Sequence, residues 1–205
     1  MKFNQKLFLL SGMFIPIIFW LTLGICGLIL DNYSHLTNLV SELGIIKYPT
    51  HLIFTIGLFL CAGFSATFFI GLFKICKNEK LNTIPIFIIF ICTFSFAGIA
   101  AFPMPHRLHE LFGYLSIFLL LSPPLAVILW SRKDKLKNLR LFSTISLFIM
   151  ALGFLAFFPE ILSNYFGLKQ RFFHIGWSIW FLYLSWSFIN LYNRQSLVNS
   201  RTGSV

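Results

Sequence analysis

The stretch LFLLSGMFIPIIFWLTLGICGLIL, residues 7–30, carries no charged side chain over roughly 24 positions. A helix of about 20 apolar residues crosses the hydrocarbon core of a bilayer, which is about 30 Å thick. The stretch is too long for the apolar core of a signal peptide, and no small-residue cleavage site follows it. It therefore predicts a retained transmembrane helix.

Five further apolar runs follow, at residues 51–73, 83–102, 108–130, 141–158 and 172–192. Only 11% of the 205 residues are charged, against about 25% in soluble domains. The runs leave no room for a soluble domain. The sequence therefore predicts an all-α, polytopic membrane bundle of six transmembrane helices, which forms a single domain over residues 1–205. The Ser122-Pro123-Pro124 segment predicts a kink in the fourth span.

Basic residues predict the orientation of the bundle. Lysines and arginines concentrate on the cytoplasmic side of membrane proteins, and most of those in this chain fall at one end of the predicted spans: Lys2, Lys6, Lys74, Lys77, Lys80, Arg132, Lys133, Lys135, Lys137, Arg140, Arg194 and Arg201. We therefore expect both termini to be cytoplasmic, in a bacterial inner membrane. The net charge of +10 reflects this topology and attraction to anionic lipids, so no nucleic-acid partner is expected.

All five histidines fall near the opposite, outer surface: His35, His51, His106, His109 and His174. Four of the six acids accompany them: Asp31, Glu42, Glu110 and Glu160. Ionisable residues at membrane depth are costly and usually mark a functional site. The sequence therefore predicts an outward-facing polar pocket.

The first outer connection has an amphipathic pattern. Read as a helix, residues 31–44 place Asp31, His35, Asn38 and Glu42 on one face, because their spacings are four, three and four. Leucines and Val40 form the opposite stripe. We expect a short helix at the outer interface, which either lies in water or covers the pocket.

Histidines at the starts of spans four and six favour two kinds of metal site. His106, His109 and His174 could supply the three protein ligands of a catalytic zinc, with Glu42 or Glu110 as general base. The chain lacks the HExxH motif of zinc proteases. His109 and His174 could instead ligate a single haem, which is the weaker prediction. Hydrogen-bonded interfacial histidines without any metal are the simplest alternative.

Metal-free acid–base chemistry is a further possibility. His109 with Glu110, or His35 with Glu42, could act on a lipid headgroup or ester, with Ser34 or Ser41 as the nucleophile. No nucleophile-elbow sequence is present. Arg107 and Arg171 could hold a phosphate, or pair with acids or headgroups, and His35 and Asn38 of the loop helix could contact the same substrate. Membrane lipids or a lipid-linked substrate are the expected partners.

Two segments resemble the signatures of a six-helix membrane family known as domain of unknown function 998. The first is Tyr33-Ser34-His35 leading to Ser41-Glu42-Leu43-Gly44. The second runs from Phe102-Pro103 through His106 and His109 to Phe112-Gly113. The resemblance covers about residues 7–192. It implies an integral membrane protein and brings no established activity, so no catalytic roles are carried over.

The outer set of histidines, acids and serines is also similar to that of ceramidase-like membrane zinc hydrolases. Those proteins have seven spans and a HxxxH pair that is absent here. Three functions remain open: a metal-dependent hydrolase of a lipid or lipid-linked substrate, a lipid or small-molecule binding or transport protein, and a membrane scaffold. The hydrolase predicts convergence of His106, His109, His174 and Glu42, transport predicts a cavity that continues to the inner half, and a scaffold predicts no pocket.

Overall fold

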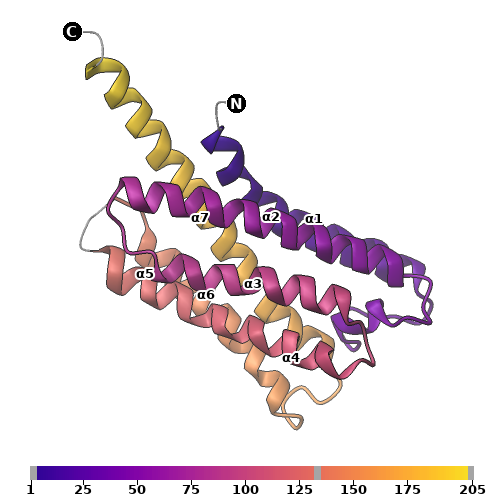
Figure 1. The fold of residues 1–205 in the computed structure, drawn as a ribbon. Coiled ribbons are helices and arrows are strands. Elements are labelled where there is room, and N and C mark those ends of the chain that lie inside the picture. The colour runs from indigo at the N-terminus through magenta and orange to yellow at the C-terminus, as the bar shows by residue number, and fades with distance from the viewer. Residues whose placement is uncertain (1–3, 132–134, 203–205) are drawn as a thin grey trace.

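A computed structural model of the chain describes residues 4–131 and 135–202, with side chains through residue 194 (Figure 1). Lys2, Arg132 and Lys133, which entered the orientation argument, lie outside the described residues, as does the side chain of Arg201. Six helical segments are long and apolar enough to cross a membrane: Gln5–Ile29, His51–Asn78, Ile84–Ala101, Arg107–Trp130, Leu139–Phe157 and Phe166–Arg194. The six-helix membrane bundle predicted from the sequence is confirmed.

The described elements follow one another as α1 (Gln5–Ile29), η1 (Val40–Gly44), α2 (His51–Asn78), α3 (Ile84–Ala101), α4 (Arg107–Leu115), η2 (Ser116–Leu121), α5 (Ser122–Trp130), α6 (Leu139–Leu152), η4 (Gly153–Phe157) and α7 (Phe166–Thr202). The fourth span is thus two α-helices joined by the 3₁₀ segment η2. Its second α-helix begins at Ser122, immediately before the two prolines, where proline is tolerated because first-turn amides lack helical partners. The fifth span also ends in a 3₁₀ segment, η4.

Helices that follow one another in the chain lie side by side, and α7 returns to pack against both α6 and α1 (Figure 1). The sixth span is the most buried of the six. Its interior face carries large aromatic side chains, including Trp177, Trp180, Phe181 and Phe188, that are almost fully buried. These side chains contact residues of α1, α2 and α5.

Several hydroxyl groups inside the bundle donate hydrogen bonds to backbone carbonyls of neighbouring helices. Ser146 of α6 donates to the carbonyl of Gly176 at 2.5 Å, and Ser185 of α7 donates to that of Leu9 at 2.6 Å. A side chain at Gly176 would overlap the Met150 backbone, so this glycine permits the close approach of α6 and α7. Small residues and interhelical hydrogen bonds are typical of membrane bundles.

One end of the bundle carries the connections 30–50, 102–106 and 158–165, and we call it the histidine end. His35 lies in the first connection and His106 in the second, next to the start of α4. The remaining histidines lie at the start of α2, in the first turn of α4 and about two turns into α7. The clustering that the sequence indicates is therefore present, while which side of the membrane this end faces stays a prediction.

Two elements at the histidine end differ in extent from the sequence prediction. Within residues 31–44 only Val40–Gly44 is helical, as a 3₁₀ turn, and residues 31–39 form turns. The Glu42 carboxylate accepts hydrogen bonds from the Leu39 amide and from the Asn38 side chain, which favours a turn over a continued helix. α7 begins at Phe166, six positions before the predicted span. Its polar first turns are hydrogen-bonded to the first connection, through the amides of Gly167 and Leu168.

Candidate functional site

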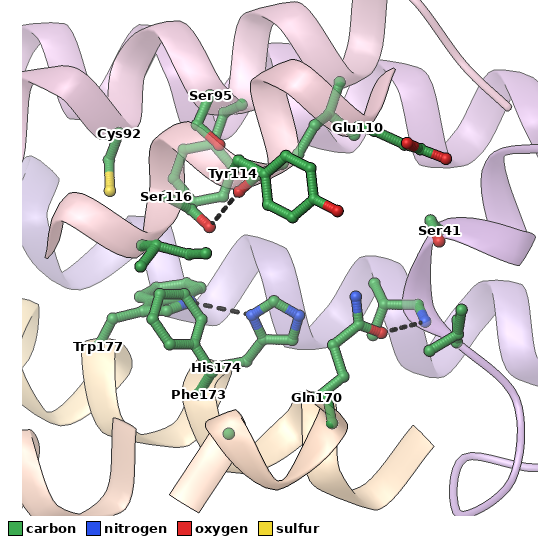
Figure 2. A pocket seen from close by; sticks show the side chains of 18 of the residues that line it. Ser41, Cys92, Ser95, Glu110, Tyr114, Ser116, Gln170, Phe173, His174 and Trp177 are labelled. Carbon is green, nitrogen blue, oxygen red and sulfur yellow. Dashed lines mark hydrogen bonds between the residues drawn. The ribbon is translucent and has the colours of Figure 1, made fainter. Parts of the chain in front are cut away.

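A cavity of about 390 Å³ lies at the histidine end, between α3 and α4 on one side and α7 on the other (Figure 2). Its walls also include Phe19 of α1, Phe54 and Leu58 of α2 and the 3₁₀ segment η4. Residues 39–41 of the first connection cover it. Its size is at the lower end of the range for small-molecule sites.

The residues that line this cavity all lie in the half of each span nearest the histidine end, with Cys92 at the middle of α3. Most of the lining is apolar. The polar contributions come from the side chains of Ser41, Ser95, His109, Glu110, Tyr114, Ser116, Gln170 and His174. A largely apolar cavity with a few convergent polar groups is typical of ligand sites.

The cavity opens sideways. Tyr114 of α4 and Phe157 of η4 line it and are 55% and 57% exposed. Phe154 of η4 also lines it and is 37% exposed. Because exposed aromatic residues on both helices border the cavity, its mouth lies between α4 and η4. Both elements belong to predicted spans, so this mouth faces the region that lipid chains would occupy.

His174 is held in one orientation by Trp177, one turn further along α7. The indole Nε1 of Trp177 donates to Nδ1 of His174 at 3.1 Å. Indole nitrogen is only a donor, so Nδ1 is the acceptor and a neutral ring carries its proton on Nε2. Nε2 is buried and has no hydrogen-bond partner among the described residues. His174 therefore presents a neutral ring with an unused N–H donor at the cavity.

Gln170 lies one turn before His174 on the same face of α7. Its carbonyl oxygen accepts a hydrogen bond from the Val40 amide at 2.7 Å. This bond fixes the orientation of the carboxamide, and the amide nitrogen faces the cavity beside the His174 ring (Figure 2). Gln170 was not among the site residues predicted from the sequence. The i, i+4 spacing to His174 was the available signal.

Arg171 attaches the first connection, residues 30–50, to α7. It is 6% exposed, and its Nη1 donates to the carbonyls of Asn38 at 3.1 Å and Gly167 at 2.9 Å. Its Nη2 donates to the Tyr33 hydroxyl at 2.7 Å and contacts Nδ1 of His35 at 2.9 Å. No carboxylate lies within ion-pair distance of Arg171 in the described part of the chain.

The contacts of Arg171 change the titration of two groups outside the spans. Burial, followed by the positive charge of Arg171, lowers the pKa of His35 below its usual 6.5. Burial raises the pKa of the Tyr33 hydroxyl, and Arg171 partly offsets that rise. His35 is thus favoured as a neutral acceptor. Backbone bonds from Gly167 to Thr37 and from Leu168 to Leu36 complete the attachment.

The three candidate zinc ligands do not gather at one point. His109 is 7% exposed and lines the cavity, and its Nδ1 donates to the Phe102 carbonyl at 3.0 Å. His106 is exposed and does not line the cavity. Its Nδ1 accepts from the Leu108 amide at 3.2 Å and so caps α4. Within residues 4–131 and 135–202, no three or more His, Cys, Asp or Glu side chains are grouped to hold a metal.

The candidate catalytic residues are divided between the cavity and the loop. Ser41 and Glu110 line the cavity with His174 (Figure 2). In the described structure no hydrogen bond links the Ser41 hydroxyl to Glu110 or His174, so they form no preassembled catalytic triad. Both oxygens of Glu42 are bonded within the loop at 2.8 Å, and Glu42 does not line the cavity.

The candidate substrate-binding residues have mainly loop roles. Arg107 is exposed and does not line the cavity. Asn38 and His35 are bonded to Glu42 and Arg171, respectively. Arg171 itself is turned toward the loop and not toward the cavity. Asn38, His35 and Arg171 thus hold the first connection, whose residues 39–41 cover the cavity. Contact between a substrate and any of the four residues stays a prediction.

Comparison with known families gives one match. The family described as "protein of unknown function (DUF998)" matches residues 13–187. The chain belongs to this family. The match includes both segments in which the sequence resembles the family, and the six spans fit a six-helix membrane family. No curated protein and no solved structure matches.

Membership of the DUF998 family brings no named activity, substrate or cofactor. The second signature segment contains Phe102, His109 and Phe112. Phe102 and Phe112 stack with 5.6 Å between ring centroids, and the Phe102 carbonyl binds the His109 ring. These contacts fold the turn before α4 and thereby place His109 and Glu110 at the cavity. Function is therefore argued from the cavity itself.

Proposed function

We propose that this protein binds a membrane lipid in the cavity at the histidine end, with the acyl chain entering between α4 and η4. The observation that carries the proposal is the sideways mouth bordered by Tyr114, Phe154 and Phe157. A cavity that opens toward lipid and is lined mainly by apolar groups takes a ligand that is itself in the bilayer.

The distribution of polar groups in the cavity supports an amphipathic ligand. Ser41 and Glu110 lie toward the loops, whereas Trp177 and Cys92 lie deeper (Figure 2). The Ser95 and Ser116 hydroxyls near Cys92 already donate to backbone carbonyls. A lipid inserted with its polar group toward the loops would match this order. The lining extends only to the middle of the spans, which favours binding over passage through the bundle.

A photo-crosslinking experiment tests lipid binding. The purified protein is placed in liposomes of phosphatidylethanolamine and phosphatidylglycerol that contain a phosphatidylethanolamine with a diazirine-labelled acyl chain. After irradiation, adducts are mapped by mass spectrometry of peptides. We expect adducts on Phe96 or Trp177, which are 9% and 3% exposed and so are shielded from bulk lipid. Adducts confined to exposed residues would contradict the proposal.

Two glycines offer a matched pair of variants. A Cβ at Gly113 or at Gly63 would meet no heavy atom within 4 Å, so a larger side chain fits at either position without overlap at its first atom. Gly113 lines the cavity and Gly63 does not. We expect Gly113→Leu to lower the interior adducts severalfold and Gly63→Leu to leave them unchanged. Equal adduct yields in the two variants would argue against occupation of this cavity.

Hydrolysis of a bound lipid is the second candidate, and one observation favours it: Ser41, Glu110 and His174 line the same cavity. In that hypothesis Ser41 attacks an acyl ester carbonyl while Glu110 accepts the serine proton. The ester bond breaks to release the lysolipid, and water then hydrolyses the acyl-serine to the free fatty acid. The test is the release of lysolipid and fatty acid from the same liposomes. Release by the wild-type protein that is lost in Ser41→Ala would support it, and no release would remove it without affecting the binding proposal.

A further inference from the structure

We infer that the cavity recognises the carbonyl oxygen of an acyl ester or amide, which accepts hydrogen bonds from Nε2 of His174 and from the carboxamide of Gln170. The inference rests on the proposed lipid binding and specifies its chemistry. It starts from two N–H groups on successive turns of α7 that face one region of the cavity (Figure 2).

The donor character of His174 follows from its partner. Trp177 occupies Nδ1 as a donor, and a doubly protonated ring could not accept that bond. The ring is therefore neutral, with its proton on Nε2. A buried donor without a partner is unfavourable, and no acceptor is present for this one among the described side chains. A ligand oxygen would remove this deficit.

The Gln170 carboxamide is fixed with its nitrogen toward the same region. Its oxygen is committed to the Val40 amide, so the amide cannot turn over without losing that bond. The described residues provide no acceptor for the nitrogen. Two neutral donors from one helix face thus lack an acceptor, and the ligand atom that fits between them is an oxygen with lone pairs to spare, as in a carbonyl.

Charge around the cavity favours an uncharged acceptor over a phosphate or carboxylate. Among the described residues no lysine or arginine lines the cavity, whereas Glu110 does. Arg171, one position from Gln170, has both terminal nitrogens bonded to the loop. An anionic group beside His174 would be repelled by Glu110 and would have no cation to pair with it, at a depth where unpaired charge is costly.

Depth along α7 agrees with the position of a carbonyl in a glycerolipid. Gln170 and His174 come first from the histidine end, and Trp177 lies one turn deeper. Phe96 packs against Trp177, with 5.7 Å between ring centroids, and both line the cavity. An ester carbonyl lies between the polar headgroup and the apolar chain, so a chain placed against Trp177 brings the carbonyl to the level of His174.

The test compares two unlabelled competitors for the photo-crosslink on Phe96 or Trp177, in detergent micelles. One is a diester phosphatidylethanolamine, and the other is the diether lipid with the same chains and headgroup. A site built on hydrogen bonds discriminates against an analogue that lacks the partner. We expect the diester to compete at a concentration about tenfold lower than the diether, as two neutral hydrogen bonds would produce.

Variants assign this discrimination to His174. His174→Phe removes one of the two donors and keeps a flat ring, so we expect the tenfold preference to fall to about threefold, the share that Gln170 provides. His106→Phe makes the same substitution at an exposed histidine outside the cavity and should keep the tenfold preference. His174→Gln retains an N–H donor and should keep a larger part of the preference than His174→Phe. Loss of discrimination in His106→Phe, or full discrimination in His174→Phe, would overturn the assignment.

The outcomes separate this inference from the proposed function. If both lipids displace the interior crosslink equally from the wild-type protein, the cavity binds lipid and the carbonyl inference is wrong. If neither lipid displaces it, the proposed lipid binding fails as well. A diether that competes better than the diester would also overturn the inference, because the unpaired donors would then have no role in recognition.

Discussion

Nη2 of Arg171 lies 2.9 Å from Nδ1 of His35, and the two groups join α7 to the first connection. The guanidinium is always a donor, so the histidine nitrogen must be the acceptor and must be unprotonated. Nearby, the Tyr33 ring packs against the His35 ring at 5.2 Å between centroids. The cover of the proposed lipid cavity is therefore attached through a histidine that has to remain neutral.

Acid should weaken this attachment. The pKa of His35 is lowered in the folded protein by burial and by Arg171, so the unfolded chain binds the proton first as the pH falls. The contribution to stability is present above the unfolded value of 6.5 and is lost as the pH falls below it. We expect the Tm of the wild-type protein to fall more steeply between about pH 7.5 and pH 5 than that of His35→Gln.

The difference in Tm should be small, roughly 2 °C, because the His35 side chain is exposed. His51→Gln serves as the control, since Nδ1 of His51 donates to the Gly44 carbonyl, a bond that a protonated ring can also make. It should keep the wild-type pH dependence. Identical slopes for the wild-type protein and His35→Gln would show that this bond does not couple stability to pH.

Arg171→Lys should destabilise the protein by about 2 kcal/mol. A lysine carries one nitrogen and cannot reach the loop carbonyl, the Tyr33 hydroxyl and the His35 ring together. Arg107→Lys changes an exposed arginine in the first turn of α4 and should have an effect below about 0.5 kcal/mol. Denaturant unfolding of both variants in the same detergent measures the two changes in the free energy of unfolding. Similar changes in the two variants would contradict a special role for Arg171.

The apolar runs were enough to predict the six spans, because a bilayer imposes a minimum length of apolar helix. The start of α7 was predicted too late. Lys169 and Arg171 reduce the local hydropathy, yet both are buried. Lys169 is bonded to the Phe158 carbonyl at 2.9 Å, and Arg171 is bonded to residues more than 130 positions away. Such contacts leave no local signal in a single sequence.

The site was predicted in part for a similar reason. His174 and Glu110 line the cavity, as expected for residues near the outer ends of spans. Glu42 looked equally available in the sequence, but its carboxylate is used by a turn whose geometry depends on the docked loop. Gln170 was missed because a lone glutamine carries no catalytic signature. Its importance comes from the fixed direction of its amide.

Glu42→Gln separates a structural role from a catalytic one. The carboxylate accepts from the Leu39 amide and from the Asn38 side chain, both at 2.8 Å. The oxygen of a glutamine can accept one of these bonds, but its NH2 group cannot accept the other. We therefore expect the free energy of unfolding to fall by about 1–2 kcal/mol. Glu160→Gln, at an exposed acid, should change stability little.

A catalytic role for Glu42 makes the opposite prediction. Thermal unfolding of Glu42→Gln would match that of the wild-type protein, while any lysolipid release would disappear. Measuring the two quantities on the same preparation decides between these roles, because a loop contact and a general base affect different observables.

Glu110 should select against anionic ligands. It lines the cavity, and no lysine or arginine of the described part of the chain does, so an ionised fatty acid in the cavity would meet an uncompensated like charge. At mildly alkaline pH we expect oleate to displace the interior crosslink severalfold better from Glu110→Gln than from the wild-type protein. The uncharged methyl ester of the same acid should compete equally with both. The gain for oleate should shrink in high salt, because Glu110 is exposed at the mouth. Glu160→Gln removes an exposed acid that does not line the cavity, and a similar gain there would assign the effect to overall charge instead of to Glu110.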